Sequence, residues 1–116
     1  MTHAGRLAAL LVLAATVASC ATAGQAASPV PTNAVDLPRS YRFAPDAIVV
    51  EVGTTVTWTN SDNFTHSVQF DGEASPGLVM APGEGAQRTF ATAGTFAYEC
   101  AFHAQDMHGT VIASSD

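Results

Sequence analysis

The chain has 116 residues, 47% of them hydrophobic and 12% charged, with four Arg, no Lys and ten acidic side chains for a formal charge of −6. A chain this short suits one domain, and its acidic balance argues against a nucleic-acid binder, because neutralising phosphates requires clustered Lys and Arg. Its apolar content argues against intrinsic disorder, and its two Cys are too few for a disulfide scaffold or for a zinc site built from several thiolates.

The N-terminal segment is typical of an export signal. Arg6 is the only positive side chain near the start, and residues 7–18 form an apolar run that only Thr16 interrupts. These twelve residues are too few to span a bilayer as a helix, which takes about 20. A basic start, a short apolar run and small residues after it predict a signal peptide over residues 1–19. Its removal would leave three Arg against ten acidic side chains, a formal charge of −7.

Cys20 stands directly after this predicted signal. Residues 17–20, Val-Ala-Ser-Cys, resemble the lipobox of bacterial lipoproteins. The resemblance implies that Cys20 carries lipid on its thiol, becomes the mature N-terminus and anchors the protein to the cell membrane, where stable residence takes two or more acyl chains. The alternative is an ordinary secretory signal cleaved between residues 21 and 27, which would discard Cys20 and leave a secreted or periplasmic protein.

A stretch rich in Ala, Ser, Thr and Pro follows, and it has no hydrophobic period. This composition predicts a flexible tether over residues 20–39. The folded domain is then expected over residues 40–116, a length that is small but adequate for one hydrophobic core.

Alternating apolar residues separated by turn formers recur along this domain. The strands that they predict span residues 47–52, 55–59, 66–70, 88–90, 95–100 and 109–113. In the second of these, Val56 and Trp58 would face the core while the Thr side chains face outward. Residues 71–85 hold six Gly or Pro and are predicted as loop. Because no helical period is present, the pattern predicts an all-β fold, an antiparallel sandwich or barrel.

The chemistry is concentrated at the ends of two predicted strands. His66 begins one strand and Cys100 ends another, and both side chains lie on the inward face by the alternation. If these strands are antiparallel neighbours, the two residues meet at one end of the sandwich. His103, Met107 and His108 follow Cys100 within a short loop. Two imidazoles, a thiolate and a distant thioether are the ligand set of a blue-copper site.

Each of these residues has a simpler interpretation when taken alone. A single inward His is commonly a hydrogen-bonded core residue, a single buried Cys acts as a small hydrophobe, and a single Met is usually packing. Their coincidence favours the metal site. A Cys-x-x-His motif, with a Met four residues after its His, occurs together with the inward-facing His66 upstream. The loop acids are interpreted as solvated surface charges and not as a second metal site; they are Asp62, Asp71, Glu73 and Glu84.

From residue 41 to residue 113 the sequence resembles the plastocyanin and amicyanin-type cupredoxins. The matching stretches are residues 43–45, 48–50, 53–60, 65–68, 81–83, 93–103 and 107–111. The resemblance implies a Greek-key β-sandwich that binds one type 1 copper ion and transfers single electrons between Cu(I) and Cu(II). Carried over residue by residue, the ligands implied are His66, Cys100, His103 and Met107.

Two departures from the family pattern bear on the site. Three residues separate His103 from Met107, whereas amicyanin-like members have two and plastocyanins have four, and the plastocyanin count would make His108 the axial ligand. Met107 is preferred because residues 107–111 match the family ending. Ser67 stands where the family commonly has an Asn that joins the two ligand loops, which predicts a less rigid site or a different potential.

The function expected from these features is a monomeric, membrane-tethered, extracytoplasmic electron carrier. We expect redox partners to dock near His103, on apolar surface supplied by Phe102 and Ala104, and we expect aromatic core residues to support the ligands; these are Trp58, Phe70, Phe96 and Tyr98. No enzymatic activity is expected, because protein ligands would occupy all copper positions and no hydrolase or phosphate-binding motif is present. The alternative is a lipoprotein that stores or delivers copper without redox turnover. An apo interaction module is disfavoured, because all four ligands are present.

Overall fold

The computed structural model describes residues 28–115. The predicted signal peptide, residues 1–19, and the predicted lipid attachment site, Cys20, lie outside the described residues. Over the described range, no helix has the length and apolar character needed to cross a membrane.

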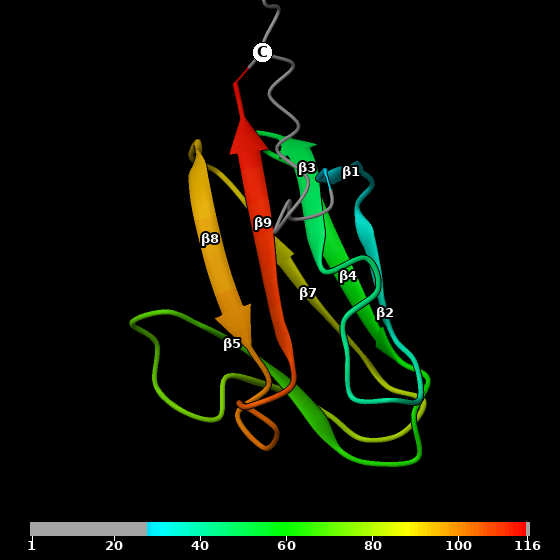
Figure 1. Ribbon diagram of the computed structural model, residues 1–116. Coiled ribbons are helices and arrows are strands. Elements are labelled where there is room, and N and C mark those ends of the chain that lie inside the picture. Colours follow the sequence, from blue (N-terminus) through cyan, green and yellow to red (C-terminus); the bar gives the residue numbers. More distant parts are fainter. Residues whose placement is uncertain (1–27, 116) are drawn as a thin grey trace, which may run out of the picture.

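Residues 28–115 form nine strands in two sheets (Figure 1). In chain order these are β1 (Val30–Pro31), β2 (Ala34–Leu37), β3 (Ala47–Glu51), β4 (Thr55–Asn60), β5 (His66–Phe70), β6 (Leu78–Met80), β7 (Gly85–Thr89), β8 (Gly94–Glu99) and β9 (His108–Ser114). The larger sheet has the order β1-β3-β9-β8-β5-β6, and the smaller has the order β2-β4-β7. β1 and β3, β2 and β4, and β3 and β9 pair in parallel, and the remaining pairs are antiparallel. The predicted all-β sandwich is confirmed, and its sheets are mixed.

The apolar residues of the alternating pattern that predicted the strands lie on the buried face of each sheet. In β4, Val56 and Trp58 are buried while Thr55 and Thr59 are exposed. Packing one face of each sheet against the other removes these apolar side chains from water, and full burial of a side chain of this kind stabilises the fold by about 1.5–3 kcal/mol. The core therefore lies between the two sheets.

An aromatic cluster fills the core beneath the end of the sandwich that carries the candidate ligands. The Trp58 and Tyr98 rings meet edge to face with centroids 5.5 Å apart, and Phe70 lies 5.2 Å from Tyr98 and 5.9 Å from Trp58. Such pairs add about 0.5–1.5 kcal/mol each beyond their buried area. Phe96 is only partly buried and packs against Phe90 at the edge of this cluster.

β2 lies within the segment predicted as a tether. Its side chains Val35 and Leu37 are buried in the core, and Val35 is paired with Trp58 of β4. The tether prediction is therefore wrong over residues 30–37, which include β1 as well. Strands of two and four residues show too little alternation to be recognised, and their burial depends on partners far away in the sequence.

β6 lies within residues 71–85, which were predicted as loop. Met80 in this strand is fully buried and is paired with His66 of β5. The Gly and Pro residues on either side of these three residues concealed the strand. The next strand, β7, begins at Gly85, three residues before the predicted start.

The pairing of β5 with β8 brings the candidate ligands together. The two strands are antiparallel, with Gln69 opposite Glu99 and Phe70 opposite Tyr98. The beginning of β5 and the end of β8 therefore lie at the same end of the sandwich, as the sequence predicted. His66 is the first residue of β5, and Cys100 directly follows the last residue of β8.

Candidate metal centre

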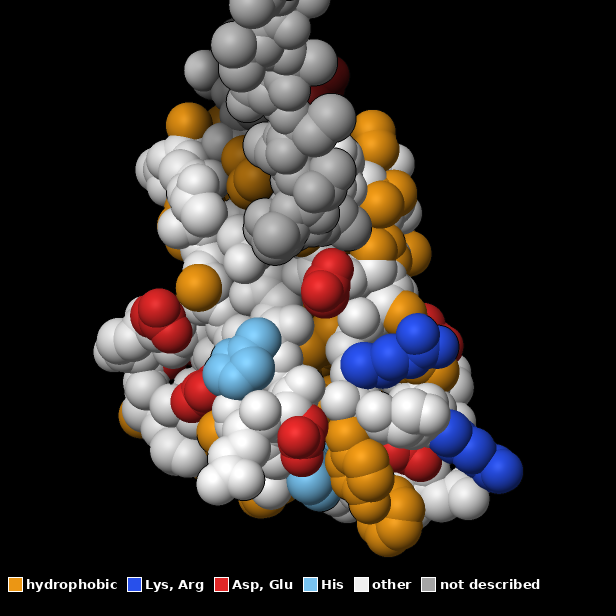
Figure 2. Space-filling model, in the orientation of Figure 1, with side chains coloured by type: hydrophobic (Ala, Val, Ile, Leu, Met, Phe, Trp, Pro, Cys, Tyr) orange, Lys and Arg blue, Asp and Glu red, His pale blue; other side chains and the backbone are white. Residues whose placement is uncertain are grey.

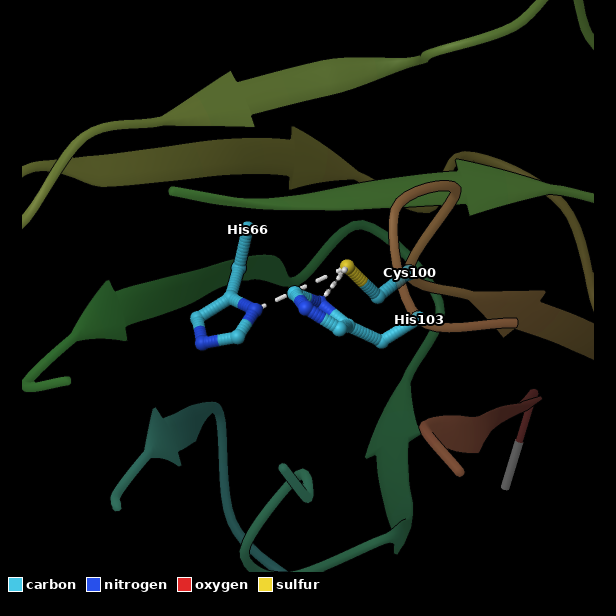
Figure 3. A group of neighbouring side chains, drawn as sticks. All are labelled: His66, Cys100 and His103. Carbon is cyan, nitrogen blue, oxygen red and sulfur yellow. Dashed lines mark hydrogen bonds between the residues drawn. The ribbon is translucent and has the colours of Figure 1, made fainter. Parts of the chain in front are cut away.

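Three of the predicted ligands converge on one point (Figure 3). The Cys100 Sγ atom lies 3.7 Å from His66 Nδ1 and 3.7 Å from His103 Nδ1. All three ligand atoms lie within 4.8 Å of one another. His66 and Cys100 are fully buried, and His103 is half-buried at the surface.

The spacing of these atoms fits a metal ion better than it fits a direct hydrogen bond. Metal–sulfur and metal–nitrogen bonds of about 2.3 and 2.0 Å, at the roughly 120° of a trigonal site, would place sulfur and nitrogen about 3.7 Å apart. Both observed sulfur–nitrogen distances are 3.7 Å. A thiol between two imidazoles is also the donor chemistry that favours copper. The residues present therefore fit a copper ion.

The loop after Cys100 is closed by its own backbone. The N–H of Cys100 donates to the carbonyl of Met107, the N–H of His103 donates back to Cys100, and the N–H of Met107 donates to His103. These bonds turn the chain tightly enough to place a second imidazole three residues after the thiol. The three residues between His103 and Met107 are accommodated within this turn.

Met107 and His108 face opposite sides of the chain. Met107 is fully buried within the core cluster, whereas the side chain of His108 is 61% exposed and its Nδ1 lies 3.9 Å from Glu99 Oε2. Of the two candidates for an axial ligand, only Met107 is on the inner side. The exposed His108 is placed as a surface residue.

Ser67 joins the two ligand segments. Its backbone N–H donates to Cys100 Sγ at 3.3 Å, and its buried hydroxyl accepts a hydrogen bond from the N–H of Ala101 at 2.9 Å. A short hydroxyl thus makes a hydrogen bond across the two segments where the family commonly has Asn, and the less rigid site or different potential expected from Ser67 stays a prediction.

Asp62 is buried beside His66, and the expectation that it is a solvated surface charge is wrong. It is only 5% exposed, and its Oδ2 lies 2.8 Å from His66 Nε2, the ring nitrogen that faces away from Cys100. The hydrogen bond with His66 holds the pKa of the Asp62 carboxyl below its ordinary value, although burial opposes this shift. The sequence placed Asp62 in a turn and offered no signal of this contact beyond its position four residues before His66.

Three aromatic residues, Tyr41, Phe64 and Phe102, form an aromatic rim at the surface near His103. The Tyr41 ring lies 4.6 Å from the His103 ring and stacks on Phe64 at 5.8 Å. Phe64 and Phe102 are each about half exposed. In Figure 2, hydrophobic side chains gather beside a histidine at the lower end of the molecule, where the orange loop after β8 lies in Figure 1. Of this rim, the sequence predicted only Phe102.

Tyr41 reaches His103 through an unusual backbone. Ser40 and Tyr41 have φ angles of 102° and 52°, which non-glycine residues rarely adopt. This bend directs the chain after β2 across the ligand end of the sandwich. Tyr41 was missed because 62 positions separate it from its ring partner, and nothing local in the sequence indicates the contact.

Comparison with known sequences gives one consistent result. Residues 33–114 match the family described as copper binding proteins, plastocyanin/azurin family. Plastocyanin from Scenedesmus fuscus is 35% identical over 81 residues, which cover 60% of this chain and 83% of that protein. Chloroplastic plastocyanin from Tetradesmus obliquus is 37% identical over 72 residues, covering 53% of this chain and 50% of that protein.

Solved structures agree with the sequence matches. A variant of amicyanin in its reduced state superposes with a TM-score of 0.64 at 32% identity, over 75% of this chain and 92% of the other. A purple cupredoxin from Nitrosopumilus maritimus superposes with a TM-score of 0.61 at 25% identity, over 72% of this chain and 100% of the other. The match over residues 33–114 includes both predicted ligand segments.

Proposed function

This chain belongs to the plastocyanin/azurin family of copper-binding proteins, its cofactor is one type 1 copper ion, and we propose that it carries single electrons between protein partners outside the cytoplasm. Bound copper supplies one-electron chemistry between Cu(I) and Cu(II). The observation that carries the proposal is the convergence of His66 Nδ1, Cys100 Sγ and His103 Nδ1 within 4.8 Å in a largely buried site.

In this proposal the chain's own residues keep the ligands in place during electron transfer. His66, Cys100, His103 and the buried Met107 would hold the ion, which would supply one-electron chemistry there. The backbone N–H of Ser67 donates to the Cys100 sulfur, which limits movement of the thiolate. Four protein ligands leave no position for a substrate, so we propose an electron carrier and not an enzyme.

The aromatic rim is the proposed surface for redox partners. Tyr41 lies against His103 and stacks on the exposed Phe64, and the exposed Phe102 directly precedes His103 in the chain. An apolar surface of this kind suits brief docking, because it can be desolvated without breaking ion pairs. The proposal places the electron path at the half-buried His103 and its aromatic neighbour, in a monomeric carrier.

The visible spectrum of the purified protein tests this function. After addition of Cu(II), we expect an intense blue thiolate-to-copper band that ascorbate bleaches reversibly, and we expect Cys100→Ser to abolish it. Binding of Cu(I) alone, with no blue species, would contradict electron carriage and favour the alternative, copper storage or delivery without redox turnover.

We also propose that lipid on Cys20 anchors the protein to the outer face of a bacterial cell membrane. Support comes from the sequence alone: Cys20 directly follows a basic start, a short apolar run and the residues Val-Ala-Ser. Fractionation of expressing cells is expected to place the protein with membranes, and Cys20→Ser is expected to abolish incorporation of labelled fatty acid. A mature N-terminus between residues 21 and 27 would show that the signal is an ordinary secretory one.

A further inference from the structure

A buried carboxylate contacts the copper ligand His66 on the side away from the copper position. Asp62 Oδ2 lies 2.8 Å from His66 Nε2, and the exposed fractions of the two side chains are 4% and 0%. Loop acids are ordinarily solvated, since burying a carboxylate without a partner is costly. Asp62 therefore occupies its position because of specific contacts.

The chemistry of this contact determines which nitrogen of His66 is available to a metal. An ionised carboxylate only accepts hydrogen bonds, so Nε2 of His66 must carry the hydrogen. The lone pair of the neutral ring then resides on Nδ1, the nitrogen 3.7 Å from Cys100 Sγ. Asp62 thus selects the tautomer that a metal at this site requires.

A network of hydrogen bonds holds the Asp62 carboxylate in place. Its Oδ1 accepts the N–H of Asn63 at 2.7 Å, and its own N–H donates to the side chain of Asn60 at 3.0 Å. Asn60 is fully buried, and its amide nitrogen donates to the carbonyls of Phe64 and Met80. The turn that carries Asp62 is therefore joined at both ends to β4 and β6, so the carboxylate has little freedom to leave His66.

We propose that Asp62 is a positioning residue for the copper ligand His66 and that its negative charge favours Cu(II) over Cu(I). This inference rests on the proposed function, because it takes His66 Nδ1 as a copper ligand. Carboxylates that accept the second N–H of a ligating His make the ring a more basic ligand, and their loss typically costs about 10–100-fold in metal affinity.

The charge of Asp62 should act unequally on the two oxidation states. An added negative charge stabilises the doubly charged ion more than the singly charged one. Arg39 also acts on the Asp62 carboxyl, but its side chain is exposed and its effect is screened by water and salt. Each tenfold loss of Cu(II) affinity that Cu(I) does not share raises the reduction potential by about 59 mV.

The metal-free protein tests the contact itself. In the apoprotein, nitrogen-resolved NMR is expected to show His66 as the Nε2–H tautomer, with a slowly exchanging ring proton. Asp62→Ala should lose that slow exchange, whereas Asp62→Asn, which still offers an oxygen acceptor, should keep it. Unchanged exchange in Asp62→Ala would overturn the positioning role, and this result does not depend on whether the protein forms a blue copper site.

The copper protein tests the charge. Asp62→Asn is nearly the same size as the parent residue and should raise the reduction potential and speed the transfer of Cu(II) to a chelator by about 10–100-fold. Asp71→Asn is the matched control, because it removes one exposed carboxylate from a turn without touching a ligand, and it should leave both values unchanged. If Asp62→Asn and Asp62→Ala both match this control, Asp62 does not tune the copper.

Discussion

Replacing Ser67 by Ala tests how the two ligand segments are joined. The substitution removes only Oγ, which accepts the hydrogen bond from Ala101 N–H at 2.9 Å. It leaves the backbone donor of residue 67 on Cys100 Sγ unchanged. Ser67 is fully buried and the hydrogen bond is part-buried, so water has limited access to the Ala101 N–H that loses its acceptor.

The expected loss of stability follows from that burial. Leaving a buried hydrogen-bonding group unsatisfied costs about 1–3 kcal/mol, and because this bond is part-buried we expect a loss near the lower end of that range. Ser61→Ala is the matched control, because the Ser61 hydroxyl also makes one hydrogen bond, to Asp36, but on the exposed surface. The control is expected to change the free energy of unfolding by less than about 0.5 kcal/mol.

Two measurements on the same Ser67→Ala protein check this expectation. Urea unfolding of the apoprotein should show a lower midpoint with an unchanged slope, since the surface exposed on unfolding is the same. Transfer of copper to a chelator should be about tenfold faster, because residues around metal ligands affect how firmly the ion is held. If Ser67→Ala and Ser61→Ala differ in neither measurement, the hydroxyl does not join the segments and the reasoning is refuted.

Three other predictions follow from the site and the core beneath it. Burial raises the pKa of Tyr98 to about 12, Asp46 adds to this, and the nearby Trp58 indole opposes it without meeting the geometry of a hydrogen bond. The unfolded chain therefore loses this proton near pH 10 while the folded chain keeps it. The contribution of Tyr98 to the free energy of unfolding is fully present below pH 10 and should fall by roughly 2–3 kcal/mol between pH 10 and 12. Alkaline unfolding curves should show this loss in the parent protein and not in Tyr98→Phe. Met107→Leu should keep the blue band and shift the reduction potential, whereas His108→Ala should change neither; a larger effect of His108→Ala would identify it as the axial ligand. Phe102→Glu should slow electron self-exchange between oxidised and reduced protein, measured by NMR line broadening, and an unchanged rate would exclude the rim around His103 as the contact surface.

The features predicted from the sequence are those with a local signal. Alternation within β4 and β5 assigned Val56, Trp58 and His66 to the buried face, because a period of two depends only on neighbouring residues. The Cys-x-x-His spacing is likewise local, since one short loop places both side chains. The family match over residues 33–114 and the convergence of the ligand atoms agree with these predictions.

Only the tertiary structure determined the surroundings of the ligands. Asp62 and Ser67 are polar residues that an isolated chain would leave in water. Ser67 is buried where β5 packs between β6 and β8, and Asp62 is buried in contact with His66 and Asn60. Tyr41 covers His103 because β2 pairs with β4 and the bend after it crosses the ligand end. Such contacts depend on pairings between distant segments, and no local pattern encodes them. The alternation and motif spacing of this acidic, 116-residue chain thus predicted its fold class and a candidate set of copper ligands, whereas long-range packing determined which groups support, orient and cover that candidate site.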